Sequence, residues 1–149
     1  MENLTLVIPA KNEKESLPIV LNELKKFNIK ILIVLEKNDL ETIDSIKNFN
    51  CDILYQSNKG YGDALIEGIN NTKTKYFCIF NADGSFVSDE LEKMYTLLEN
   101  KHSDFVFGSR YMKNASSDDD TLITYVGNKI FSFIGNLFFS LEILSLIQI

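Results

Sequence analysis

Short apolar runs alternate with helical patterns along most of this chain, and that alternation restricts the fold more than any other feature. The segments between the runs space their apolar residues as helices do, as in Leu17, Val20, Leu21 and Leu24. The apolar runs predict strands at residues 4–8, 31–35, 52–55, 76–80 and 105–107. A strand–helix–strand repeat produces parallel strands joined by right-handed crossovers. The predicted fold class is therefore α/β, with a mostly parallel sheet flanked by helices.

Composition narrows the functional classes. The chain has 149 residues, 45% of them hydrophobic, which suits one domain with a real core. Its formal net charge of −6 argues against a nucleic-acid partner, because such a partner requires a basic surface. The single histidine, His102, leaves no room for a histidine-rich zinc site.

Cysteine usage and the N-terminus predict a cytoplasmic location. Cys51 and Cys78 lack C-x-x-C spacing and fall in or beside predicted strands, so we expect two reduced thiols. The apolar run from Leu4 to Pro9 is too short for the hydrophobic region of a signal peptide, and Lys11 follows it closely.

The C-terminal part of the chain has a different character. We expect a main domain over residues 1–113, a polar loop over 114–121 and an apolar helix over 122–149. A stripe of small polar residues on that helix comprises Asn128, Ser132, Asn136 and Ser140. The length leaves a transmembrane span open, but the stripe, Gly135 and Glu142 favour a helix packed on protein or lying at a membrane interface. The second reading would place the protein peripherally at the cytoplasmic face of a membrane.

Polar clusters follow four of the predicted strands, at residues 9–13, 58–63, 81–83 and 108–111. The carboxyl ends of parallel strands meet at one edge of a sheet, and ligands of open α/β sheets bind there. We therefore expect the four clusters to converge on one ligand.

Each cluster suggests a task and has a simpler alternative. Asn12 and Glu13 offer hydrogen bonds to a nucleobase or ribose, although Asn12 could equally cap a helix. Gly60 and Gly62 allow a backbone to approach an anion at a helix N-terminus. Arg110 could pair with a phosphate or form a surface ion pair. Asp83 could hold a hard divalent cation or merely belong to a turn.

The same clusters resemble the motifs of a known family. Residues 7–13 (VIPAKNE) look like the opening V-I-P-A-x-N-E of family 2 glycosyltransferases with the GT-A fold, and residues 58–62 (NKGYG) resemble the family's N-x-G-x-G. Residues 81–85 (NADGS) look like its D-A-D-G-S metal motif. Residues 108–111 (GSRY) match the polyprenyl-phosphate sugar transferase branch, which is similar to dolichol-phosphate mannose synthase. The resemblance covers about residues 4–140, in the family's order and spacing.

The resemblance implies a site and a reaction. Asp83 would hold Mg²⁺ or Mn²⁺ on the donor diphosphate, Arg110 would lie near the donor or acceptor phosphate, and these two are the catalytic candidates. The donor, a UDP- or GDP-linked sugar, would be bound by Pro9, Ala10, Asn12, Glu13, Glu36, Lys59, Gly60, Gly62, Asn81 and Ala82. The acceptor would be a lipid phosphate at a membrane surface. Because a phosphate monoester is already anionic near neutral pH, its attack on the sugar needs no strong general base.

Three departures from the family pattern keep alternatives open. Asn81 replaces the first aspartate of the metal motif, and Glu36 is the one carboxylate in the segment that is D-D-G-S in the family. The family's acceptor-side segment, with a further aspartate, has no counterpart before Ile149. One alternative is therefore a truncated, inactive protein that binds a nucleotide-sugar. Another is a nucleotidyltransferase, although the loop after the first strand lacks the glycine that such an enzyme prefers.

Overall fold

A computed structural model describes residues 1–101, 104–108 and 122–139. Backbone contacts divide the chain into two compact units, Met1–Leu91 and Glu92–Ile149, and each is described by itself. The predicted loop at 114–121, His102, Arg110 and the last ten positions, 140–149, lie outside the described residues. The elements in chain order are β1 (Leu4–Pro9), α1 (Ser16–Leu24), β2 (Lys30–Leu35), α2 (Leu40–Ile46), β3 (Asp52–Tyr55), α3 (Tyr61–Asn70), β4 (Tyr76–Ile79), α4 (Glu90–Lys101) and α5 (Leu122–Phe139).

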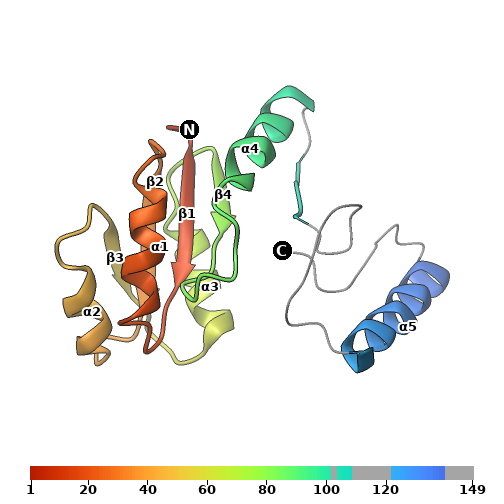
Figure 1. The fold of residues 1–149 in the computed structure, drawn as a ribbon, viewed down its shortest axis with the longest axis horizontal. Helices are drawn as coiled ribbons and strands as arrows, with labels where there is room; N and C mark the ends of the chain where they lie inside the picture. Colours follow the sequence, from red (N-terminus) through yellow and green to blue (C-terminus); the bar gives the residue numbers. More distant parts are fainter. Residues whose placement is uncertain (102–103, 109–121, 140–149) are drawn as a thin grey trace. The chain divides into compact units, whose positions relative to one another are not determined.

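The first unit is built on a parallel sheet with the strand order β3-β2-β1-β4 (Figure 1). Val7 of β1 lies opposite Leu32 of β2 on one side and Ile79 of β4 on the other, and every neighbouring pair is parallel. The chain moves outward from β1 through β2 to β3 and then returns to place β4 on the other side of β1. This reversal creates a topological switch point between β1 and β4, where ligands of such sheets bind. The predicted α/β class is confirmed.

The core forms because helices cover both faces of the sheet. All six residues of β1 are buried, as expected for a central parallel strand. Val7 and Val34 pack with Ala64 of α3, so α3 covers the face to which these side chains point. Side chains alternate along a strand, so Leu6 and Ile8, both fully buried, point to the opposite face. Figure 1 draws α1 on that side, where it buries its leucines Leu17, Leu21 and Leu24.

Two details differ from the sequence-based expectations. Helix α1 begins at Ser16 with Glu15 at the N-cap position, so the interpretation of Asn12 as a helix cap is wrong. The fifth strand expected at residues 105–107 is also wrong, because these residues are in no strand. Phe105 and Phe107 stack on each other and are 73% and 62% exposed, so this triplet lacks the strand partners that would bury it.

In the second unit, α5 exposes much apolar surface. Ile130, Phe131, Phe133 and Leu137 are each more than half exposed, whereas Ser132 of the small polar stripe is buried. Among the described residues, no helix combines the length and apolar character needed to cross a membrane.

Candidate active site

A pocket of about 260 Å³ opens at the carboxyl ends of the four strands of the first unit. Its walls come from the segments that follow β1, β2, β3 and β4, together with the first turns of α3. The lining residues are Pro9, Ala10, Lys11, Glu13, Glu36, Gln56, Gly60, Tyr61, Ala64, Asn81, Ala82 and Asp83. The pocket therefore lies at the switch point of the sheet, where three of the four predicted clusters converge.

Most of the residues predicted for the site line this pocket. These are Pro9, Ala10, Glu13, Glu36, Gly60, Asn81, Ala82 and Asp83. Asn12 and Lys59 lie in the same loops and Gly62 in the first turn of α3, but none of the three is among the lining residues. Arg110 lies outside the described residues.

Four lining residues were not predicted: Lys11, Gln56, Tyr61 and Ala64. Lys11 and Tyr61 occupy variable positions of the motifs at residues 7–13 and 58–62, where the motif itself does not specify a residue. Gln56 directly follows β3, and its place at that strand end is a signal that could have identified it. Ala64 lies on the buried side of α3, one turn after Gly60.

The loop after β1 is fixed to β2. The backbone N–H of Ala10 donates to the carbonyl of Val34 over 2.9 Å, which continues the ladder beyond the strand. The Lys11 ammonium lies 3.0 Å from Glu36 Oε1. The Glu36 side chain is only 14% exposed and that of Lys11 is 68% exposed, so the pair offers a shielded carboxylate beside a solvated cation. A ligand on the β2 side of the pocket would meet the Glu36 carboxylate as an acceptor and the Lys11 ammonium as a donor, side by side.

The loop before α3 is held in an unusual backbone conformation. Gly60, the N-cap residue of α3, has φ +110°, which residues with a side chain rarely adopt. Gln56 Nε2 donates to the carbonyl of Asn58 over 2.6 Å. The Asp63 carboxylate accepts from the backbone N–H and the side-chain amide of Asn58, over 3.2 and 3.1 Å. These bonds fix the turn that presents the N-terminus of α3 to the pocket.

The turn after β4 orients the carboxylate of Asp83. Asp83 Oδ1 accepts from the backbone N–H of Ser85 over 2.9 Å, and Gly84 supplies the φ of +80° that the turn needs. The amide nitrogen of Asn81 donates to Ser85 Oγ over 3.1 Å. With its nitrogen engaged, Asn81 has its side-chain oxygen left as a ligand for a cation.

Tyr61 lies near this carboxylate. Partial burial, and then the negative charge of Asp83, raise the pKa of the Tyr61 phenol above its ordinary value. The phenol therefore stays protonated at neutral pH and is a hydrogen-bond donor at the pocket wall.

Among the residues the structure describes, no group of three or more His, Cys, Asp or Glu side chains could hold a metal ion. At the β4 side, the pocket instead offers the oriented carboxylate of Asp83 and the amide oxygen of Asn81. This small donor set fits Mg²⁺, which proteins often hold through one or two carboxylates together with substrate phosphates and water.

The sequence also matches known proteins. A model described as "Glycosyl transferase family 2" matches residues 5–147, nearly the whole chain. An uncharacterized glycosyltransferase of Mycobacterium tuberculosis is 30% identical over 107 residues, which cover 72% of this chain and 48% of the relative. A UDP-N-acetylglucosamine–dolichyl-phosphate N-acetylglucosaminyltransferase of Methanococcus voltae is 28% identical over 151 residues, 87% of this chain and 60% of the relative. An uncharacterized protein of Methanocaldococcus jannaschii is 28% identical over 89% of this chain and 57% of its own length. The chain thus spans about half the length of the relatives it matches.

Proposed function

This chain belongs to glycosyl transferase family 2, and we propose that it transfers a sugar from a nucleoside-diphosphate donor to a lipid phosphate. The observation that carries the proposal is the pocket at the switch point. It gathers Glu36 from the end of β2, Gly60 from the start of α3 and Asp83 from the end of β4. One extended ligand with a base at one end and a diphosphate at the other would use all three.

We assign the two ends of the donor by charge. The diphosphate belongs near Asp83 and the N-terminus of α3, because backbone N–H groups at a helix start favour anions. The nucleobase belongs near Lys11 and Glu36, whose paired donor and acceptor suit the edge of a base. UDP and GDP both carry such an edge, so both are candidate donors.

The proposed metal would be held by Asp83, with Asn81 as a weaker ligand. Mg²⁺ or Mn²⁺ bound there would supply the positive charge that stabilises the departing nucleoside diphosphate. The bond from Ser85 N–H holds the Asp83 carboxylate in one orientation before any cation binds. The Tyr61 phenol, a neutral donor beside Asp83, can bond to an oxygen of the donor without adding charge.

The acceptor assignment rests on chemistry and on one relative. A phosphate monoester is a ready nucleophile, so the reaction needs no strong base. The printed name of the Methanococcus voltae relative specifies a dolichyl-phosphate acceptor. Arg110, which the family resemblance places near the donor or acceptor phosphate, completes the proposed set.

Calorimetry tests the donor site. UDP-N-acetylglucosamine and a GDP-linked sugar are each titrated into the protein with and without Mn²⁺. We expect one of them to bind more tightly with the metal, and Asp83→Ala to remove that gain. Asp52→Ala is the matched control, because Asp52 is an exposed carboxylate at the amino end of β3, the opposite edge of the sheet. Equal affinity in Asp83→Ala and wild type would exclude the metal assignment.

Transfer is measured separately. Radiolabelled sugar is followed into polyprenyl phosphate in detergent or vesicles, with free inorganic phosphate as the second acceptor. Label in the lipid alone supports the proposed acceptor. Donor binding without transfer to either acceptor would contradict it and favour an inactive binding protein, whereas pyrophosphate release from a nucleoside triphosphate would indicate a nucleotidyltransferase.

A further inference from the structure

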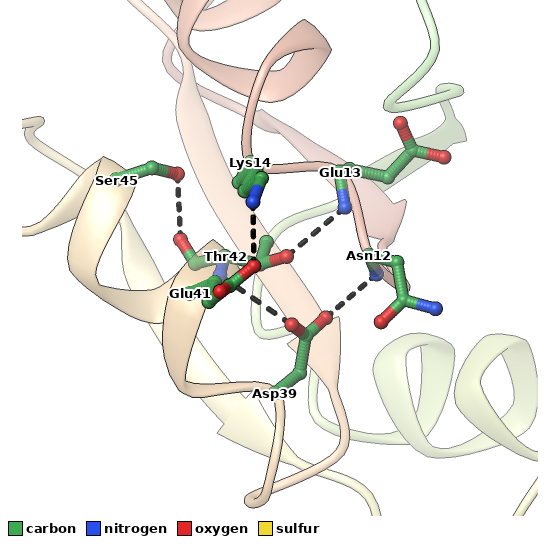
Figure 2. A network of polar contacts seen from close by, with 7 residues as sticks. All are labelled: Asn12, Glu13, Lys14, Asp39, Glu41, Thr42 and Ser45. Atoms are coloured by element: carbon green, nitrogen blue, oxygen red, sulfur yellow. Dashed lines mark hydrogen bonds and ion pairs between the residues drawn. The ribbon is translucent and has the colours of Figure 1, made fainter.

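The loop at residues 9–13, which forms the β1 side of the pocket, is hydrogen-bonded to side chains at the start of α2. Figure 2 shows the contacts: the backbone N–H of Asn12 donates to Asp39 Oδ2 over 2.8 Å, and that of Glu13 donates to Thr42 Oγ1 over 3.0 Å. These bonds join segments that are 27 and 29 residues apart in the chain. Two successive backbone donors of the loop are therefore satisfied by side chains of one helix start.

Asp39 serves two elements at once. It is the N-cap residue of α2, and its Oδ1 accepts from the backbone N–H of Thr42 over 3.4 Å. Its other oxygen holds Asn12. Hydrogen bonds to a charged acceptor are stronger than neutral ones, so this carboxylate couples the start of α2 to the position of the loop.

Thr42 provides the second bond from a fully buried position. Without its hydroxyl, the partly buried N–H of Glu13 would lose its acceptor, and a donor left unpaired away from water costs free energy beyond the lost bond. The turn itself needs support, because Asn12 has φ +59°, a left-handed conformation that costs energy in a residue with a side chain. Two bonds from α2 hold this turn in place.

The turn decides which groups reach the pocket. Asn12 is exposed and does not line the pocket, whereas Lys11 and Glu13 on either side of it do. The Glu13 carbonyl also accepts from the N–H of Leu17 over 3.0 Å, so the same residue leads into α1. A shift of the Asn12–Glu13 backbone would move two lining side chains together.

We infer that Asp39 and Thr42 are positioning residues for the donor site, because they fix the backbone of the loop at residues 9–13. Neither residue lines the pocket, so each acts through the loop and touches no donor atom. The inference rests on the proposed function, since it names residues that prepare the same pocket for the nucleotide-sugar.

The variants separate the loop contacts from helix stability. Thr42→Val keeps the shape and removes the acceptor, and Thr42→Ser restores the hydroxyl. Asp39→Ser keeps a good helix cap with a side chain too short to reach Asn12. Glu41→Gln is the matched control, because it weakens the exposed Lys14–Glu41 ion pair between the same two segments and leaves both hydrogen bonds to the loop backbone in place.

The first measurement is amide hydrogen exchange by NMR in the protein without donor. We expect the Glu13 amide in Thr42→Val and the Asn12 amide in Asp39→Ser to exchange about tenfold faster, the effect of losing one hydrogen bond. Thr42→Ser and Glu41→Gln should exchange like wild type. Unchanged exchange in both test variants would overturn the positioning role, whether or not the protein binds a donor.

The second measurement is the Kd for the donor that wild type binds in the calorimetry above. Thr42→Val and Asp39→Ser should bind about tenfold more weakly, with wild-type affinity in Thr42→Ser and Glu41→Gln. Faster exchange with unchanged Kd would also overturn the inference, because the hydrogen bonds from Asp39 and Thr42 would then hold the loop without affecting donor binding. If wild type binds neither donor, the proposed function fails, and the exchange data alone still report whether α2 holds the loop.

Discussion

At the scale of single residues, Asn12 lies in a left-handed backbone conformation at the start of the loop that leads to α1. Its φ of +59° favours glycine or asparagine over other residues. We expect Asn12→Gly to change the free energy of unfolding by no more than about 0.5 kcal/mol, and Asn12→Ala to lower it by about 1 kcal/mol. Urea denaturation measures both. Equal losses in the two variants would instead indicate that the Asn12 side chain itself stabilises the loop.

Cys78 gives a prediction about alkaline pH. Burial raises the pKa of its thiol from 9.0 to about 11, so the folded protein keeps the proton at pH values where the unfolded chain loses it. The stability from this residue is therefore complete below pH 9 and declines as pH rises toward 11, by roughly 1–3 kcal/mol in total.

Urea denaturation of wild type and Cys78→Ala at pH 8 and pH 10.5 tests this sign. The cavity left by alanine lowers stability equally at both pH values, so it cancels when each protein is compared with itself. Wild type should lose more stability between the two pH values than the variant. Equal losses would mean that Cys78 ionises as freely in the folded protein as in the unfolded chain.

Residues at the site differed in how well the sequence could predict them. Asp83 could be predicted because it follows the end of a strand, and the parallel sheet brings strand ends together, whereas Glu36 was predicted only through the family resemblance. Asp39 could not be predicted, because its contact with Asn12 joins positions 27 residues apart through a backbone group, which carries no sequence signal. Asn12 was predicted as a donor contact, and this stays a prediction; the structure shows how the Asn12 backbone is held.

At the scale of elements, the packing of α3 on the sheet depends on Gly68. A Cβ at this position would lie 2.4 Å from Val7 Cγ1 and 2.9 Å from Val34 Cγ2. Alanine is normally the better helix residue by about 1 kcal/mol, but this overlap forces α3 away from β1 and β2. We expect Gly68→Ala to lower the free energy of unfolding by about 1–3 kcal/mol.

Gly62→Ala in the same helix is the control for Gly68→Ala. A Cβ at Gly62 meets no atom within 4 Å, so this change should leave stability equal or slightly higher. Thermal or urea denaturation of the two variants makes the comparison. A Gly68→Ala protein as stable as Gly62→Ala would show that α3 can move outward freely.

Elements were predictable where local pattern and sheet pairing agree. The bounds of β3 match those predicted, because its apolar pattern ends where a turn begins. The triplet at 105–107 has the apolar character of a strand, but a strand exists only through its hydrogen-bonded neighbours. Local pattern carries no information about those partners, and so the prediction of a fifth strand failed.

At the scale of the whole molecule, the carboxyl and amino edges of the parallel sheet in the first unit differ in backbone conformation. Among the described residues, those with positive φ are Asn12, Gly60 and Gly84, and all three lie in the segments that follow the carboxyl ends of strands. A parallel sheet makes this separation possible because all strands end on the same side. Unusual backbone conformations therefore collect at the edge where the pocket lies.

This difference between the two edges predicts where a bound nucleotide will protect backbone amides from hydrogen exchange. With saturating UDP or GDP and Mn²⁺, hydrogen exchange followed by mass spectrometry should slow together in peptides covering residues 9–13, 56–63 and 81–85, because these segments line one pocket. Peptides from the amino edge, at 25–29 and 71–75, should exchange as before. At a nucleotide concentration about 100 times Kd, the linkage would stabilise the folded unit by about 2.7 kcal/mol. Slower exchange confined to one segment would contradict a shared site, and equal slowing at both edges would indicate general stabilisation without a pocket at the switch point.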